Sequence, residues 1–580
     1  MAVGALSRPR VSLPWQVRAR VRPVRLPIEN TLIWAGAFAF YITFAAYAVF
    51  HLHFMINDAL TRTDNAFDVL YSRDPHLGAI GFSWPPLPSF LQLPLLAFKG
   101  LWPPLATQGF AGSIEAAAFS AGSVVLVNVG LRWAGVVRGM RAVLCLLWMI
   151  NPMIVIYGTQ GMSEATFIFF FLASVIVFLR WSENRRASLL PLAGILAGCA
   201  ALCRVEAILV AFLMGYCVLT QAIQNRAGWR RAETQVLLYA LPAALVIGLW
   251  LVTAAILFHD PLYVVHAYGL FTQPTVVAPI HATHAAVAAH AAAAAAATNN
   301  AYGVVSINSW KDAATTVANH MLDICPAVAA LGALLIVQIV ARNGRVARSN
   351  LLVLGLAIPA FDVLQERVGT SPLLRYQIVA IPFAFLLAIQ VLRAVRGKRA
   401  LISSITALGM AVVLALSNLV TAQTLSNPSL AEEEWPVMRS VVTGQTVDPS
   451  GDYGALAAAP GINAQLLKLD WDRGLILCDS ATCFALNVTA PDPKLFVVTS
   501  DRNFEAAAAN PRAYQVEYFL VPKPEGAGAI DRLNGLYPSL WQNGGGFATL
   551  IGEGRGGGPM LNWRLYRISG STGRSIRIPR

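Results

Sequence analysis

Four aspartates follow the first long apolar segment of the chain. Asp58, Asp64, Asp68 and Asp74 fall within 17 residues. A carboxylate in such a place can take a proton from an attacking hydroxyl, which is general-base chemistry. If the segment is helical, Asp58 lies one turn from Arg62, because residues four apart are neighbours on a helix, and Asp64 and Asp68 share that spacing. A solvated loop helix with local ion pairs is the alternative interpretation.

Further polar residues stand at the ends of later apolar segments. The alternation of basic loops, described below, predicts that they lie on the same side of the membrane as these aspartates. They are Glu164, Arg204, Glu206, His266, Arg375 and Tyr376. Arg204 and Arg375 stand beside apolar segments, where a charge is costly unless it has a partner. A guanidinium suits a phosphate, to which it can donate two parallel hydrogen bonds. An internal ion pair of Arg204 with Glu164 or Glu206 is the alternative.

The segments between these residues are apolar enough to cross a bilayer. Of the 580 residues, 56% are hydrophobic and 13% are charged, whereas about a quarter of the residues of a globular domain are charged. A spanning helix needs about 20 mostly apolar residues. About eleven segments qualify, at 31–54, 108–130, 142–158, 164–181, 188–203, 207–223, 235–258, 320–341, 350–365, 376–392 and 400–420. The composition predicts a polytopic α-helical membrane protein and excludes soluble enzymes, disordered chains and disulfide scaffolds.

Basic residues alternate between the connecting loops. About 22 cationic residues lie at 8–25 and in every second loop after it, at 132–141, 180–186, 226–231, 342–348 and 393–399, whereas the other loops hold about seven. Cytoplasmic loops carry the excess of Lys and Arg. The sequence therefore predicts a plasma-membrane protein with a cytoplasmic N-terminus, and with eleven spans everything after about residue 420 lies outside. The net charge of +13 is then explained by topology and not by nucleic-acid binding.

Three parts are predicted along the chain. Residues 1–30 form a basic cytoplasmic segment, residues 31–425 a transmembrane domain, and residues 426–580 an extracytoplasmic α/β domain. The transmembrane domain has long outer loops at 55–106, where prolines bound short helices, and at 259–318. Strand-like runs in the last part lie at 474–478, 495–499, 518–521 and 562–566, with a helix over 504–510. Cys478 and Cys483 are near enough in sequence to form a disulfide outside the cell, and two free thiols are the alternative.

The sequence lacks the motifs of nucleotide-dependent enzymes. Neither a Walker-type loop nor a Gly-rich dinucleotide fingerprint is present, and the polar residues face away from the cytosol. A group-transfer enzyme of this topology would need a donor carried by lipid. No cofactor is demanded, although the aspartates suit a divalent cation, Mg²⁺ or Mn²⁺, held with waters. His281, His284 and His290 lack the accompanying Cys or carboxylate cluster of a metal site.

A multi-span transporter or lipid flippase is the alternative from another functional class. Transporters are typically built from inverted repeats and carry charges at the membrane midplane. The sequence has no convincing internal repeat, and Glu115 is the main charge inside an apolar segment. The clustering of polar groups at one membrane face favours an enzyme.

The order of these motifs resembles the GT-C superfamily, multi-span glycosyltransferases that take a sugar from a polyprenyl phosphate on the outer membrane face. The motifs are an Asp after the first span, a Pro-rich first outer loop, a Ser at the head of the fourth span, Arg204-Val205-Glu206, Asp260-Pro261-Leu262 and Arg375-Tyr376. The stretch 58–87 is especially similar to uncharacterised actinobacterial members. The resemblance covers roughly residues 30–420.

The resemblance implies an inverting hexosyl- or pentosyltransferase that moves a sugar from a polyprenyl-phosphate donor to an extracytoplasmic glycan, lipid or protein. Asp58 best matches the first-loop carboxylate that acts on the acceptor hydroxyl, with Asp64 and Asp74 in reserve. Arg204 and Arg375 match basic residues near the lipid phosphate. Further substrate contacts are expected from Arg62, His76, Glu164, Glu206, His266 and Tyr376.

Overall fold

The computed structural model describes residues 28–226, 228–264, 309–341, 346–368, 373–396, 400–469 and 474–569. Most of the predicted basic segment 1–30 and of the predicted outer loop 259–318 lies outside these residues. His266, His281, His284 and His290 are among the residues that are not described.

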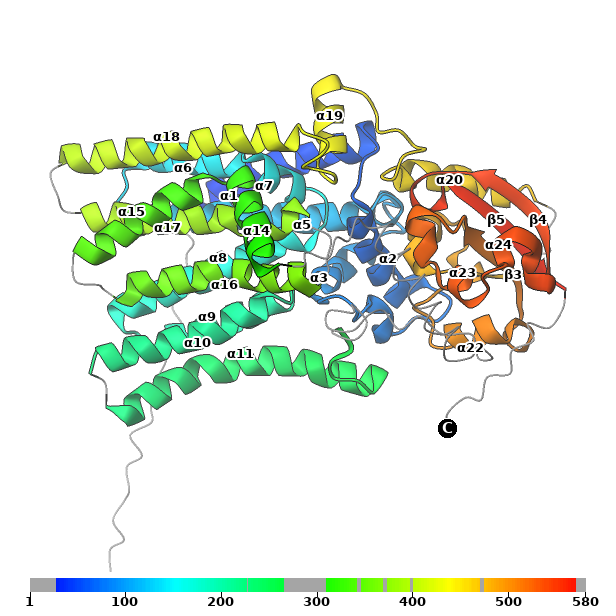
Figure 1. Cartoon of the computed structure of the whole chain (residues 1–580), viewed down its shortest axis with the longest axis horizontal. Coiled ribbons are helices and arrows are strands. Elements are labelled where there is room, and N and C mark those ends of the chain that lie inside the picture. The colour runs from blue at the N-terminus through cyan, green and yellow to red at the C-terminus, as the bar shows by residue number, and fades with distance from the viewer. Residues whose placement is uncertain are drawn as a thin grey trace, which may run out of the picture.

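Apolar helices lie side by side in a bundle (Figure 1). The longer ones are α1 (Ile28–Ala46, extended by η1, Tyr47–His51), α5 (Phe110–Trp133), α8 (Ser163–Asn184), α10 (Ala207–Gln224), α11 (Trp229–Phe258), α16 (Val346–Val368), α17 (Ala380–Val395) and α18 (Ala400–Leu425). The shorter ones are α6 (Arg138–Met149), α7 (Pro152–Tyr157), α9 (Leu189–Ala201), α14 (Trp310–Ile324) and α15 (Ala327–Ala341). All eleven segments predicted from the sequence fall on these helices.

The outward faces of these helices are apolar, as expected in lipid. On α11, Leu241 and Leu245 are each 63% exposed, and Leu249 is 60% exposed. Because residues four apart share one helix face, the three leucines form an exposed apolar stripe. Such a stripe is stable against lipid and unfavourable in water. Among the described helices, seven are long and apolar enough to cross a membrane, or eight if the bent pair α14–α15 is one span. The chain is therefore a polytopic helical membrane protein, and the count of eleven spans stays a prediction.

Two of the predicted spans are interrupted at proline. The segment 142–158 breaks into α6 and α7 at Asn151-Pro152, where the Asn151 side chain accepts from the Ile154 N–H at 3.3 Å. The segment 320–341 bends by 102° between α14 and α15, at Cys325-Pro326. Proline lacks the N–H of an interior helical residue and its ring clashes with the preceding turn, so each helix ends there.

The basic helix ends contact one another at one end of the bundle. Arg141, near the start of α6, pairs with Glu29 of α1 at 2.5 Å. Arg396, after α17, donates to the Trp133 carbonyl at the end of α5 at 3.0 Å. These contacts bring the basic ends of α5, α6 and α17 together, and Figure 1 shows the sheet domain at the opposite end of the bundle.

The predicted first outer loop folds into short helices between the bundle and the sheet domain (Figure 1). They are α2 (Asn57–Tyr71), η2 (Leu77–Ile80), α3 (Leu87–Leu96) and α4 (Pro104–Thr107). Prolines stand at the first positions of α3 and α4, where the missing N–H costs nothing. The helix α2 carries Asp58, Asp64 and Asp68 in one rigid element.

The C-terminal part is an α/β domain with a five-stranded sheet. The strands are β1 (Leu475–Leu477), β2 (Phe496–Val497), β3 (Val516–Pro522), β4 (Ala548–Arg555) and β5 (Asn562–Ile568), in the order β2-β1-β3-β5-β4. The pairs β2–β1 and β1–β3 are parallel, and the pairs β3–β5 and β5–β4 are antiparallel. A disulfide joins Cys478, after β1, to Cys483.

Alternation along β3 divides the core of this domain between two faces. Phe519 and Val521 pack with the helices α22 (Phe504–Ala509) and α23 (Arg532–Leu536). Tyr518 and Leu520 point to the other face, into the core that continues through α20 (Ala455–Leu466) and α21 (Ser480–Thr489) to the membrane helices. Because α21 also packs on α2, the domain is fixed to the helix that carries the aspartates.

Candidate active site

A small cavity, of about 80 Å³, lies where α2 meets the bundle. Seven residues singled out from the sequence line it: Asp58, Arg62, Glu164, Arg204, Glu206, Arg375 and Tyr376. They come from α2, from the start of α8, from the turn between α9 and α10, and from η3 (Leu374–Gln377) before α17. Four separate stretches of sequence therefore meet at one hollow.

Asp58 and Arg375 form the central pair of the cavity. Nη2 of Arg375 donates to Oδ2 of Asp58 at 2.8 Å. The side chain of Asp58 is 38% exposed, whereas that of Arg375 is 9% exposed, so the carboxylate is the accessible member. Nη1 of Arg375, like its Nε, is buried and makes no hydrogen bond among the described residues. A buried N–H without a partner is uncommon, and this one can serve an acceptor atom of a ligand.

Arg204 lies between two carboxylates. Its Nη1 donates to Glu164 at 2.6 Å, and its Nε donates to Glu206. The internal ion pair that was the alternative for Arg204 is thus present, with both predicted partners. Arg204 still lines the cavity, and its guanidinium lies 5.6 Å from the ring centre of Tyr376.

Tyr376 connects the two arginines. The Arg375 guanidinium also lies 5.6 Å from the centre of its ring. Cations within about 6 Å of an aromatic centre are attracted to its face. The tyrosine therefore favours the close approach of Arg204 and Arg375, which would otherwise repel each other.

Arg62 lies one helical turn after Asp58 and packs against Trp84 and Pro85, further along the first outer loop. Its guanidinium stacks on Trp84 at 4.8 Å from the ring centre, and Nη1 approaches the Pro85 carbonyl at 3.4 Å. Asp58 pairs with the distant Arg375, so the loop-helix alternative, with purely local ion pairs, does not account for this carboxylate. Arg62 and Trp84 form one wall of the cavity.

Asp64 and Asp68 lie away from the cavity, against the α/β domain. Both side chains are fully buried. The side-chain amide of Asn487, in α21, donates to Asp64 and to Asp68 at 2.7 Å each, and Ser500 donates to Asp68 at 2.6 Å. Burial, with the Asp68 charge second, raises the pKa of Asp64 well above its usual value, and burial raises the pKa of Asp68 to about 7.

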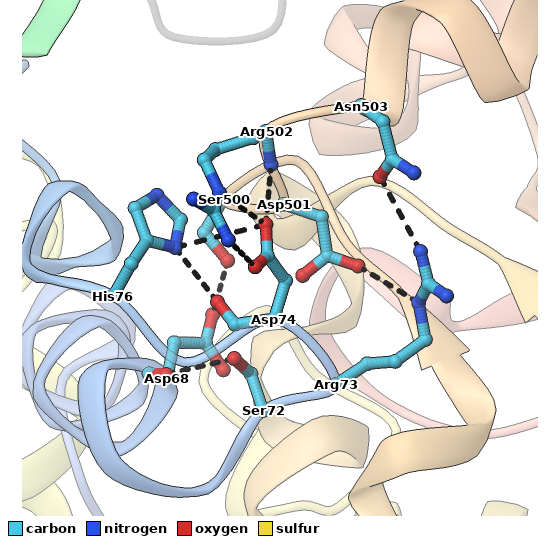
Figure 2. Close-up of polar contacts among 9 residues, drawn as sticks. All are labelled: Asp68, Ser72, Arg73, Asp74, His76, Ser500, Asp501, Arg502 and Asn503. Atoms are coloured by element: carbon cyan, nitrogen blue, oxygen red, sulfur yellow. Dashed lines mark hydrogen bonds and ion pairs between the residues drawn. The ribbon is translucent and has the colours of Figure 1, made fainter.

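Asp74 and His76 belong to a second contact between the first outer loop and the α/β domain (Figure 2). The backbone N–H and Nε of Arg502 donate to Asp74 at 3.0 and 2.9 Å. The Arg502 hydrogen bonds lower the pKa of Asp74 to about 2. His76 Nδ1 lies 2.7 Å from the Asp74 carbonyl oxygen. Next to them, Arg73 donates to Asp501 at 3.4 Å.

Glu433 is a residue near this site that the sequence did not single out. It follows α18 and pairs with Nε of Arg375 at 3.2 Å. Tyr157 donates to Glu433 at 3.4 Å and to Glu434 at 2.5 Å. The only signal in the sequence is the run Glu432-Glu433-Glu434 after the last apolar segment, which is equally typical of a solvated loop.

A resident metal ion has little support among the residues that the structure describes. They contain no group of three or more His, Cys, Asp or Glu side chains that could hold one. The carboxylates of the cavity already pair with arginines, Asp58 with Arg375 and both Glu164 and Glu206 with Arg204. A Mg²⁺ or Mn²⁺ requirement stays a prediction, and His266 lies outside the described residues.

Solved structures of membrane proteins resemble this chain along most of its length. No family model matches the sequence, and no curated protein matches it. ArnT from Cupriavidus metallidurans bound to undecaprenyl phosphate has a TM-score of 0.50 and 13% identity, over 93% of this chain and 97% of the other. The same protein in the apo state has a TM-score of 0.45 and 11% identity, over the same shares. The archaeal oligosaccharyltransferase AglB from Archaeoglobus fulgidus has a TM-score of 0.39 and 10% identity, over 85% and 69%.

The likeness to ArnT confirms the predicted resemblance to the GT-C superfamily at the level of the fold. It includes the C-terminal part, since 93% of the chain is covered. At 13% identity a shared fold does not carry a reaction or a substrate with it. The narrower resemblance to actinobacterial members stays a prediction.

Proposed function

We propose that this protein is a membrane glycosyltransferase. It would move a hexosyl or pentosyl group from a polyprenyl phosphate to an extracytoplasmic acceptor, which is a cell-envelope glycan, a lipid or a protein. The observation that carries the proposal is the Asp58–Arg375 pair, which joins an accessible carboxylate to a buried guanidinium in one cavity. The fold match to an undecaprenyl-phosphate-bound protein is compatible with it.

Asp58 is the proposed general base. It takes the proton of the acceptor hydroxyl while that oxygen forms a bond to the anomeric carbon. The bond from the anomeric carbon to the phosphate oxygen breaks at the same time, and its electron pair leaves with the polyprenyl phosphate. Direct displacement of this kind inverts the anomeric centre. A positioned base is typically worth about 10²–10⁴-fold in rate.

Arg375 is the proposed partner of the departing phosphate. Its buried Nη1 has no described partner, and an arginine aimed at developing negative charge stabilises the transition state. Arg204 adds a second positive charge next to Tyr376, with its orientation fixed by Glu164 and Glu206. Arg62 and Trp84 supply a flat wall suited to the sugar ring.

Asp64, Asp74 and His76 have no role in this proposed chemistry. Asp64 and Asp74 bind Asn487 and Arg502 of the α/β domain, and His76 contacts the Asp74 backbone within the loop. The role of Asp64 and Asp74 as reserves for the base stays a prediction, as does substrate binding by His76 and His266.

The proposed orientation puts the cavity outside the cytosol, in the plasma membrane. The basic helix ends meet at the opposite end of the bundle, and cytoplasmic ends are rich in Lys and Arg. The disulfide between Cys478 and Cys483 belongs to the same end as the cavity, and disulfides persist in oxidising compartments. Both observations support a cytoplasmic N-terminus.

Sugar transfer from defined donors tests the proposal. Purified protein in liposomes is mixed with radiolabelled polyprenyl-phosphate hexoses and pentoses and with an envelope fraction as acceptor. Release of polyprenyl phosphate together with label in the acceptor supports a glycosyltransferase. Movement of the intact lipid-linked sugar between leaflets, without release, would favour the transporter or flippase instead. Intact transfer by a D58N variant would overturn the role of Asp58.

A further inference from the structure

The segment 426–454, which we name the connector, links the last membrane helix to the α/β domain and contacts both sides of the Asp58–Arg375 pair. It includes α19 (Trp435–Thr443). Its Asp452 carbonyl accepts from the Asn57 side chain at 2.9 Å, directly beside Asp58. Its Glu433 reaches Arg375 on the other side. The connector is therefore part of the wall that fixes the pair.

Glu433 and Asp58 face different nitrogens of the same guanidinium, and only Asp58 accepts a hydrogen bond from it. Asp58 accepts from Nη2 at 2.8 Å, and Glu433 lies 3.2 Å from Nε. The Glu433 side chain is 12% exposed, and it is absent from the described lining of the cavity. Glu433 therefore contacts Arg375 on the side away from the cavity. It can act on a ligand only through the arginine.

We propose that Glu433 is a positioning residue that holds Arg375 and sets how strongly its guanidinium binds the donor phosphate. The proposal rests on the proposed function, in which Arg375 receives that phosphate. A guanidinium already facing two carboxylates has part of its charge neutralised, so a phosphate competes with them for its positive charge. Removing the Glu433 charge should strengthen the attraction between Arg375 and a phosphate.

The surroundings of Glu433 make this competition depend on pH. Burial raises the pKa of Glu433 to about 8, although Arg375 opposes the rise. The other charged groups around it are Asp58, Glu164 and Glu434, and the titratable hydroxyls are those of Tyr157 and Tyr453. Below pH 8 more of the Glu433 carboxyl carries a proton and competes less. Above pH 8 it is ionised, so phosphate affinity should fall as the pH rises from 7 to 9.

Binding of undecaprenyl phosphate to the purified full chain in detergent tests this role. The affinity of the wild-type protein should fall about five- to tenfold between pH 7 and pH 9. A tenfold difference in phosphate affinity between the protonated and ionised forms of Glu433 corresponds to a shift of about one unit in its pKa. The E433Q variant should keep a constant affinity over that range, and E433D should keep the wild-type trend. The matched control is E432Q, because Glu432 is an exposed neighbour in the same run and should behave as wild type.

An equal fall in affinity for E433Q and the wild type would overturn the proposal and leave the proposed function intact. The proposal is also wrong if E433Q is unfolded and E433D, folded, shows no trend with pH. If the wild-type protein does not bind undecaprenyl phosphate at all, both the proposed function and the role of Glu433 are wrong. The two failures are therefore distinguishable.

Discussion

Arg375 donates to the carboxylate of Asp58 over 2.8 Å, although the two residues lie 317 positions apart in the sequence. Asp58 stands in the first turn of α2 and Arg375 in the short helix η3 that precedes α17. The pair exists only when the first outer loop folds back over the bundle. A carboxylate and a guanidinium at this distance suit the proposed displacement reaction, in which one accepts a proton and the other stabilises the leaving group.

Removing the charge of Asp58 should abolish turnover and spare donor binding. In D58N the amide oxygen can still accept from Arg375, but the side chain cannot take a proton. Release of polyprenyl phosphate should fall about 10²–10⁴-fold, while affinity for undecaprenyl phosphate should not fall. Turnover in D58N within a few-fold of wild type would exclude Asp58 as the base.

Replacing Arg375 by lysine should weaken donor binding. Lysine keeps the charge but loses the planar fork that holds Asp58, Glu433 and a phosphate together. The apparent KM for the lipid-linked sugar should rise about 10- to 100-fold, a change of about 1.4–2.8 kcal/mol. The matched control is R439K, because Arg439 is exposed in α19 and makes no described side-chain contact with the cavity. An equal KM for R375K and R439K would contradict the role of Arg375.

The membrane fold could be predicted from the sequence because its signals are local. Hydropathy fixed the position of α5, α8 and α11, and the proline after Cys325 explains why the segment 320–341 bends by 102°. The strand β4 was missed. It spans Ala548–Arg555 at the edge of the sheet, contains two glycines, and has only half-buried or exposed positions. It therefore lacks the apolar run by which the other strands were found.

The candidate site could be predicted only in part, because its central contacts join residues far apart in the sequence. Arg204 and Arg375 stood out as charges beside apolar segments, and both line the cavity. Asp58, Asp64 and Asp74 could not be distinguished by spacing, because what separates them is their partners. Asn487 binds Asp64 from 423 positions away, and no local pattern marks it.

The Asp74–Arg502 contact should matter for domain attachment and not for turnover. In D74N the ion pair is lost, but Arg502 is 69% exposed, and exposed pairs are worth about 0–1 kcal/mol. Turnover should stay within about twofold of wild type, and thermal unfolding should occur a few degrees lower at most. A loss of turnover comparable to that of D58N would restore Asp74 as a candidate for the base.

The buried pair of Asp64 and Asp68 should make stability depend on pH. Burial raises the pKa of Asp68 to about 7 from an unfolded value near 3.8. Between these values the folded state binds more protons than the unfolded state, so the free energy of unfolding falls as the pH rises. In D68N this group no longer titrates. At pH 8 the free energy of unfolding of the variant should exceed that of wild type by an amount on the order of a few kcal/mol, and its unfolding temperature should be higher. At pH 5 the two should differ less.

Thermal unfolding between pH 5 and pH 8 measures this difference. The matched control is D312N, because Asp312 is exposed at the start of α14 and its loss removes the same charge without removing a buried carboxyl. D312N should follow the wild-type curve. A D68N curve parallel to wild type over the whole range would mean that burial of Asp68 does not limit stability at neutral pH.

Glycine at position 161 should be required to hold Glu164 at the cavity. Gly161 has a φ of +75°, and a Cβ there would come within 2.8 Å of the backbone of Gly112 in α5. Ala in the left-handed region costs about 1–2 kcal/mol, and the close backbone contact adds to that cost because neither backbone can yield cheaply. G161A should lower both the unfolding temperature and the affinity for undecaprenyl phosphate, since Glu164, the ion-pair partner of Arg204, lies only three residues further on. In the control G248A, where nothing lies within 4 Å of the added Cβ, stability should rise slightly, as helical Ala is favoured over Gly by about 0.5–1 kcal/mol. Wild-type stability and binding in G161A would show that the approach of α5 to this turn is not needed for the site.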